Sequence, residues 1–187
     1  MFRLFIAINL PENIKEKIGD VLREIQEENP QLKKIARWTT QENWHFTLVF
    51  LGYQPNESVP VIRRAMEEAR KDLREVKIEF KWLDYGPIGD LPRMVWLTAT
   101  KETESALSKI KNKLEEKLLE NKISWGRESR PFRAHLTLAR FLPKPLKDLP
   151  KIREELFLDF SVRSIFLMKS TLKPSGAVYE SLFQVDF

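Results

Sequence analysis

Two short motifs place both histidines of the chain on strand-like segments, and this pairing limits the possible folds more than any other feature. The 187-residue sequence contains only His45 and His135, and each opens the pattern His-apolar-Thr-Leu. Because side chains on a strand alternate faces, His45 shares a face with Thr47, and His135 shares a face with Thr137. A fold that brings these strands together creates one cleft with two imidazoles and two hydroxyls.

Such a cleft can carry out acid–base chemistry without a metal or a thiol. An imidazole titrates near neutrality, so one ring can accept a proton while the other donates one. The chain has no cysteine, which excludes disulfides and thiolate metal sites, and two histidines are too few for a three-histidine zinc site. We therefore expect no metal and no cofactor.

The charge of the chain is positive, with a net value of +5 and a pI of about 9.4. This favours polyanionic partners, but abundant lysine and glutamate without cysteine are equally typical of a thermophile-like surface. The apolar run over residues 2–8 is too short for a signal peptide or a membrane span. We expect it to be a core strand, and the protein to be cytoplasmic with no membrane partner.

Hydrophobic periodicity predicts helices interleaved with strands. Apolar stripes at helical spacing cover residues 14–25, 62–73 and 107–118, and a short proline-bounded helix is expected within 144–156. A loop is expected over residues 52–58. Strands are expected around the two motifs and over residues 2–8, 35–39, 76–85, 94–99, 160–171 and 178–187. Since many of these strands can pair through short loops, the pattern favours an α+β fold with largely antiparallel sheets.

The motifs and their flanks resemble the 2H phosphoesterase superfamily, which is named for two His-x-Thr motifs. The closer resemblance is to its LigT-like branch, the RNA 2′,3′-cyclic phosphodiesterases also called 2′-5′ RNA ligases. The similar segments are 3–11, 44–52, 130–140 and 170–179, and the resemblance covers nearly the whole chain. The sequence has Asn9 where this branch often has Asp, and Ala134 where Pro is common; neither change removes a group that the reaction needs.

The resemblance implies a bilobal α+β fold, with two pseudo-symmetric lobes of mostly antiparallel sheet, outer helices and a central cleft. Residues 1–187 are expected to form this single catalytic domain. The implied reaction is metal-independent hydrolysis of RNA 2′,3′-cyclic phosphate ends to 2′-phosphomonoesters, or formation of a 2′-5′ linkage with an RNA 5′-hydroxyl. The implied partner is RNA with such ends, tRNA fragments included, and the expected state is a monomer.

The candidate catalytic residues are His45 and His135. One would activate water and the other would protonate the leaving ribose oxygen, and the sequence does not assign these roles. Thr47 and Thr137 are candidate phosphate donors, because charge that builds on the phosphate oxygens needs placed donors. Arg140 is a further candidate, since a guanidinium makes a forked contact with phosphate.

The position of Arg140 requires a distortion of its strand. It follows His135 by five residues, so regular alternation would place it on the opposite face. We therefore expect a bend or a strand end after Leu138. The matching position in the first motif is Phe50, so the two halves are not electrostatically equivalent.

Three more residues complete the candidate substrate site. Arg133 has the parity to share the face of His135, and Arg130 in the preceding loop could reach the cleft. Tyr179 could stack on a base. For Trp38, Trp44 and Tyr85, packing is the better explanation.

Two other functions fit the same residues. The protein could be a 2′-5′ oligonucleotide or small cyclic-nucleotide phosphodiesterase, which a substrate panel distinguishes. It could also be an RNA-binding module without turnover, whose affinity would not depend on the histidines. The intact pairs of histidine and threonine argue against the binding module.

Overall fold

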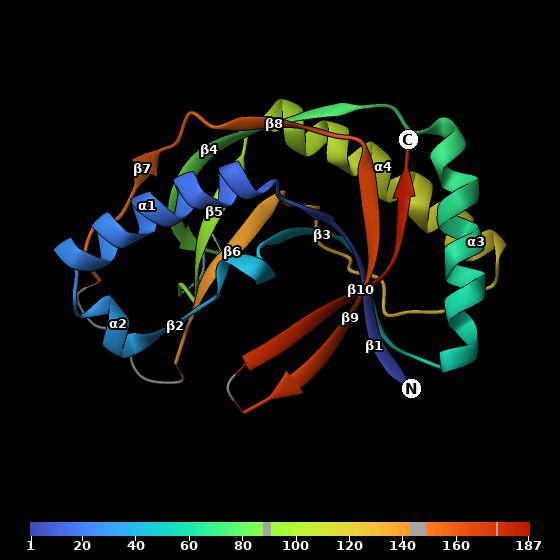
Figure 1. Cartoon of the computed structure of the whole chain (residues 1–187), viewed down its shortest axis with the longest axis horizontal. Coiled ribbons are helices and arrows are strands. Elements are labelled where there is room, and N and C mark those ends of the chain that lie inside the picture. Colours follow the sequence, from blue (N-terminus) through green and yellow to red (C-terminus); the bar gives the residue numbers. More distant parts are fainter. Residues whose placement is uncertain (88–90, 143–148, 175) are drawn as a thin grey trace.

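The computed structural model describes residues 1–87, 91–142, 149–174 and 176–187, and its strands form two antiparallel sheets (Figure 1). One sheet has the order β10-β9-β1-β3, and the other has the order β2-β6-β5-β4-β7, with β8 paired to β4 beside this path. The strands are β1 (Phe2–Asn9), β2 (Ala36–Trp38), β3 (His45–Gln54), β4 (Val76–Gly86), β5 (Met94–Ala99), β6 (His135–Phe141), β7 (Glu154–Glu155), β8 (Asp159–Val162), β9 (Ser164–Lys173) and β10 (Gly176–Asp186).

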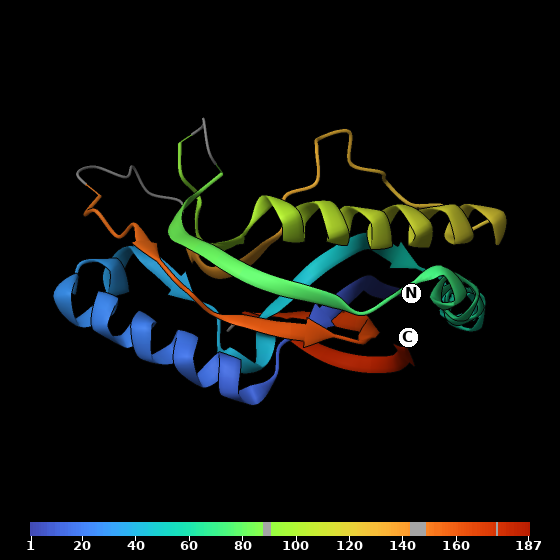
Figure 2. The same ribbon diagram turned by 90° about the horizontal axis from the view of Figure 1, so that it is seen from above.

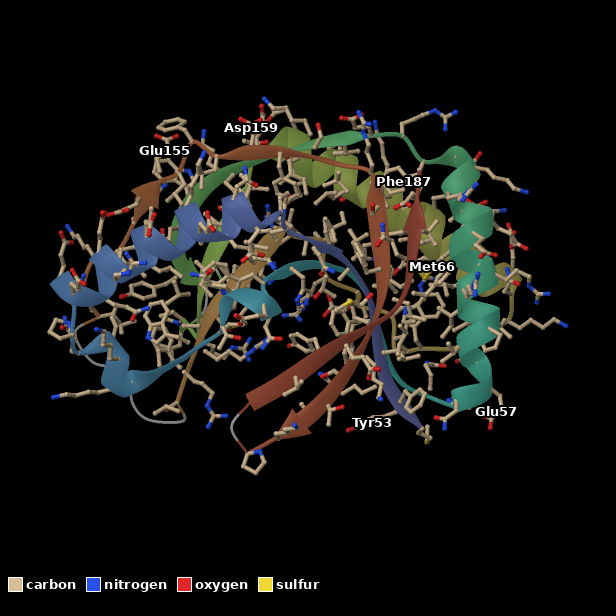
Figure 3. All side chains as sticks on the ribbon, in the orientation of Figure 1. Tyr53, Glu57, Met66, Glu155, Asp159 and Phe187 are labelled. Atoms are coloured by element: carbon tan, nitrogen blue, oxygen red, sulfur yellow. The ribbon has the colours of Figure 1, made fainter. Side chains whose placement is uncertain are left out.

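The helices cover the outside of the strands. They are α1 (Glu12–Glu28), α2 (Leu32–Ile35), α3 (Val59–Ala69) and α4 (Lys101–Glu120). Figure 2 shows α1 and α4 on opposite sides, with strands between them. Met66, which is fully buried, lies on the face of α3 that turns toward β10 (Figure 3). Within the described residues, no helix is long and apolar enough to cross a membrane.

Strand β1 shows how the sequence builds one of the two sheets. Leu4, Ile6 and Ile8 are at most 1% exposed and belong to the large core. The alternate residues Phe5 and Ala7 face the other way and, with neighbouring apolar side chains of β9 and β10, form a second, small cluster. Both faces of β1 are therefore covered by side chains, as its continuous apolar run indicates, and β3 and β9 pair with its two edges.

A β-bulge in β6 interrupts the alternation directly after the second motif. Thr137 and Ala139 pair with adjacent residues of β5, so Leu138 is the extra residue. Since a bulge shifts the side-chain alternation by one, both Leu138 and Ala139 are buried, and Arg140 returns to the face of Thr137. The bend expected after Leu138 is therefore present.

The first motif has the same distortion at the matching place in β3. Thr47 and Val49 pair with adjacent residues of β1, so Leu48 is the extra residue. Leu48 and Val49 are buried, and Phe50 turns to the face of Thr47. The two motif strands are thus alike in backbone as well as in sequence.

The expectation of a short helix within 144–156 is wrong for the described part of that segment. Residues 149–156 are not helical, and β7 within them pairs with β4; residues 143–148 lie outside the described residues. Ile152 and Leu156 are both buried, and their spacing of four mimics a helical stripe. The segment is extended because it adds to the free edge of β4, where the Tyr85 hydroxyl donates to the Pro150 carbonyl at 2.7 Å.

Two further boundaries differ from the sequence prediction. The expected loop over 52–58 begins later, because β3 continues to Gln54 through Gly52, which has a φ of +68° beside a second register shift. The expected strand over 160–171 is two strands, since β8 pairs with β4 whereas β9 pairs with β1 and β10. Arg163 lies at the crossing between the sheets, and alternation on both sides of it hides the break.

Candidate active site

Side chains from both sheets line one pocket of about 130 Å³. The two motifs reach it from β3 and β6, which are in contact at the junction of the sheets (Figure 1). The lining residues are Arg3, Phe5, Thr39, Asn43, His45, Thr47, Phe50, His135, Thr137, Arg140 and Tyr179. The pocket thus contains both histidines and both threonines of the motifs.

Both imidazoles are held by the same kind of backbone contact. Nδ1 of His45 lies 2.8 Å from the Asn43 carbonyl oxygen, and Nδ1 of His135 lies 2.8 Å from the Arg133 carbonyl oxygen. A carbonyl only accepts hydrogen bonds, so Nδ1 carries the proton in each ring. The lone pair of a neutral ring is then on Nε2, the nitrogen that a general base needs. In His45 this nitrogen lies 3.1 Å from Oγ1 of Thr47.

Aromatic side chains fix the plane of each imidazole, but differently in the two sheets. The His45 ring packs against Phe5 at 4.8 Å between centroids and meets the Tyr179 ring edge-on at 5.1 Å. The His135 ring stacks on Trp96 at 4.0 Å, with 28° between the planes. Both histidines are half-buried. The surroundings therefore hold the rings in place while leaving one edge on the pocket.

Burial makes both imidazoles poor at holding a positive charge. It lowers the pKa of His45 to about 4, against the opposing Asn43 carbonyl and with a further contribution from His135 and Arg140. Burial also lowers the pKa of His135, against the Arg133 carbonyl and together with the charge of Arg140. An anion bound between these groups would raise both pKa values, because it favours the charged rings. The electrostatics of the site suit a negatively charged ligand.

Two guanidinium groups line the pocket, one from each sheet. Nη1 of Arg140 lies 3.1 Å from the sulfur of Met94. Nη1 of Arg3 donates to Oγ of Ser170 at 2.7 Å, and its guanidinium lies 4.6 Å from the centre of the Phe50 ring. Neither arginine forms an ion pair with any residue that the structure describes. Both are therefore available to an anion.

Arg3 is a residue that sequence reasoning missed. The first motif has Phe50 at the position of Arg140, and Arg3 on the neighbouring strand provides a cation there instead. A signal was present, because Arg3 alternates with Phe5 and Ala7 and is the single cation on that face of an apolar strand. Strand pairing between β1 and β3 was needed to connect it with the motif.

The turn before the first motif also contributes residues that were not singled out. Thr39 and Asn43 line the pocket, and Nδ2 of Asn43 donates to the Ala177 carbonyl in β10 at 3.2 Å. Trp44 is 3% exposed, and its indole nitrogen donates to the Thr39 carbonyl at 3.0 Å, so its role is structural. These bonds tie the turn to the rest of the site.

The structure does not bring Arg133 and Arg130 into the pocket, although it does bring Tyr179. Nη1 of Arg133 lies 3.3 Å from Glu104, and Nη2 of Arg130 lies 3.6 Å from Glu128. Strand parity does not extend to Arg133, because β6 begins only at His135. No group of three or more His, Cys, Asp or Glu suited to a metal occurs in the described part of the chain.

The chain belongs to the 2′-5′ RNA ligase superfamily, whose family model matches residues 10–174. An Archaeoglobus fulgidus protein named RNA 2′,3′-cyclic phosphodiesterase is 31% identical over 183 residues, which cover 96% of this chain and 97% of the relative. A Methanocaldococcus jannaschii protein of the same name is 33% identical over 183 residues, which cover 95% of this chain and 96% of the relative.

Solved structures show the same fold. The crystal structure of TT0787 from Thermus thermophilus has a TM-score of 0.81 at 24% identity, and covers 98% of this chain and 97% of its own. The crystal structure of E. coli LigT with 3′-AMP has a TM-score of 0.73 at 22% identity, and covers 99% and 97%. The fold is therefore the bilobal α+β fold of LigT-type 2H phosphoesterases, as the family resemblance implied.

The low pKa of His45 predicts that it makes the protein less stable in acid. The unfolded chain takes up a proton on His45 near pH 6.5, whereas the folded protein does so only near pH 4. The free energy of unfolding should therefore fall as the pH drops through this window, by roughly 2 kcal/mol from His45 between pH 7 and pH 5. Urea unfolding at both pH values measures this loss. In His45→Gln the loss should be smaller by that amount, and equal losses in both proteins would contradict the assignment.

Gly86 is predicted to position His135 indirectly. A Cβ at Gly86 would collide with the ring of Trp96, on which the His135 imidazole stacks. Gly86→Ala should therefore cost about 1–3 kcal/mol of stability and lower kcat more than it raises KM. Gly126→Ala is a matched control, because nothing lies within 4 Å of its Cβ position. Unchanged turnover in a folded Gly86→Ala protein would contradict this role.

Proposed function

We propose that the protein hydrolyses the 2′,3′-cyclic phosphate ends of RNA to 2′-phosphomonoesters without a metal. The observation that carries this proposal is the pair of imidazoles, both protonated on Nδ1, that line one pocket with two guanidinium groups. The names of the relatives support the substrate class. A monoanionic cyclic phosphodiester has the charge and the size for such a site.

The reaction needs one proton removed and one delivered. A neutral imidazole takes a proton from water through Nε2, and the water oxygen forms a new bond to phosphorus. The bond between phosphorus and the ribose 3′-oxygen breaks, and a protonated imidazole gives its proton to that oxygen. The products are a free 3′-hydroxyl and a 2′-phosphate. With an RNA 5′-hydroxyl in place of water, the same steps give a 2′-5′ linkage.

Four side chains are placed to stabilise the charge on the phosphate oxygens. Thr47 and Thr137 supply hydroxyl donors, and Arg3 and Arg140 supply guanidinium donors. The Thr47 hydroxyl donates to Nε2 of His45 while that ring is neutral. Once Nε2 holds a proton, the hydroxyl hydrogen is free to turn toward the phosphate. The site residues all come from one chain, which supports action as a monomer, and an RNA substrate supports a cytoplasmic location.

His45→Ala and His135→Ala should each lower kcat on an RNA oligomer with a cyclic phosphate end by about 10²–10⁴-fold. The physical reason is the loss of one of two proton transfers. The measurement is the end group formed in the presence of EDTA, followed over time. Near-full activity in either folded variant would rule out the two-histidine mechanism, and complete loss of wild-type activity in EDTA would reveal a metal.

Arg140→Ala should lower kcat by about 10²–10³-fold, because one preorganised donor to the transition state is removed. Arg140→Lys should recover part of this loss, since it keeps the charge without the planar fork. Arg133→Ala is the matched control, because its side chain pairs with Glu104 outside the pocket. Steady-state kinetics on the cyclic phosphate end compare the three, and equal losses in Arg133→Ala and Arg140→Ala would contradict the assignment.

A further inference from the structure

We propose that Arg37 binds the phosphodiester on the 5′ side of the terminal nucleotide, so that the protein prefers oligonucleotide ends to single nucleoside cyclic phosphates. This inference rests on the proposed function and adds a second phosphate site to it. Arg37 lies on β2, the outer strand beside β6 (Figure 1).

The register of β2 and β6 places Arg37 beside the pocket. Arg37 pairs directly with Arg140, which lines the pocket. Directly opposed residues of antiparallel strands share a face, with Cβ atoms roughly 4.5–5.5 Å apart. Thr39, two residues after Arg37, also lines the pocket. It follows the last residue of β2, but its backbone nitrogen donates to the Leu138 carbonyl of β6 at 2.8 Å, so the extended pairing continues and Arg37 and Thr39 share a face. The pairing with Arg140 and the face shared with Thr39 both put Arg37 on the pocket side of the sheet, at the rim of the pocket.

The fold does not use the Arg37 side chain for packing. Its neighbours on β2 turn inward, since Ala36 is buried and Trp38 packs against the core, whereas Arg37 is exposed. Within the described residues, its guanidinium has neither an ion pair nor a hydrogen-bond partner. Two like charges opposed across strands destabilise a sheet, and an anion between or beside them removes that cost.

The size of the pocket requires that most of an RNA lies outside it. Sites for drug-sized ligands enclose about 300–1,000 Å³, whereas this pocket encloses about 130 Å³. The pocket therefore holds the cyclic phosphate and its immediate surroundings, and the preceding phosphodiester must cross the rim. On the side of Arg140, Arg37 provides a cation at the rim. A guanidinium there can make a charge-assisted contact to a phosphodiester.

Tyr53 marks the competing route out of the pocket. It pairs with Arg3 across β1 and β3 and is 62% exposed, near the end of β3 that lies away from the motif (Figure 3). An RNA that left the pocket on this side would stack a base on Tyr53 and would not reach Arg37. Tyr53→Ala is therefore a matched comparison for Arg37→Ala.

The test compares kcat/KM for a nucleoside 2′,3′-cyclic phosphate and for a dinucleotide with the same cyclic end, in EDTA. The wild type should prefer the dinucleotide, and Arg37→Ala should reduce kcat/KM for it by about 10- to 100-fold. The nucleoside cyclic phosphate lacks the phosphodiester on the 5′ side, so its kcat/KM should change much less. Dinucleotide binding should also depend less on salt in Arg37→Ala, because one screened charge–charge contact is lost. Arg23→Ala, an exposed cation on α1, controls for net charge and should leave the preference unchanged.

Four outcomes would overturn the proposal: no preference in the wild type, equal losses on both substrates, the same loss in Arg23→Ala, or loss of the preference in Tyr53→Ala instead. Failure of the proposed function is measured separately, as no hydrolysis of either substrate. In that case the affinities of a mononucleotide and a dinucleotide that end in a 2′-phosphate decide on Arg37. If the ratio of dinucleotide affinity to mononucleotide affinity is the same in the wild type and in Arg37→Ala, the proposal for Arg37 is overturned.

Discussion

The β-bulge that follows each motif threonine determines which side chains meet in the pocket. Without it, Val49 and Ala139 would face the pocket, and Phe50 and Arg140 would be directed into the core. An extra residue in each strand exchanges these faces and keeps Leu48 and Leu138 buried. The same distortion increases the local twist of β3 and β6, which are in contact between the sheets. The chemistry of the site therefore depends on a β-bulge, an irregularity of strand hydrogen bonding that follows the motif threonine in each half.

The two halves are alike in backbone but differ in the side chains that support the reaction. Each half gives one imidazole, one hydroxyl and one guanidinium, but the guanidinium comes from the motif strand in one half and from β1 in the other. Phe5 and Tyr179 hold one ring, and Trp96 holds the other. The general base and the general acid are thus the same chemical group, an imidazole, in two different surroundings. This difference allows the pKa values of the two histidines to differ.

The sequence predicted the residues whose place in the pocket follows from alternation along one strand. It did not predict those whose place depends on how strands pair. The faces of the motif residues follow from parity, and the need for a bend before Arg140 was visible because parity alone failed there. Arg3 escaped notice because Phe50, the motif residue that it contacts, is 47 residues away in the chain (50 minus 3). The segment 149–156 was misread because an extended edge strand with two buried residues four apart imitates a helix. Arg133 was predicted to face the pocket by strand alternation, but β6 begins only two residues later, at His135.

The short outer strands of the second sheet have a consequence for how the protein behaves at high concentration. An exposed sheet edge offers unpaired backbone groups to other chains, and short, charged edges discourage such association. Here β2 has three residues with Arg37 at its centre, and β7 consists of two exposed glutamates. One edge is thus positive and the other is negative, so two molecules that meet by like edges repel each other, whereas unlike edges attract. The residue proposed to guide RNA therefore opposes the pairing of β2 with the β2 of another molecule, and the shortness of β2 and β7 limits the pairing of unlike edges.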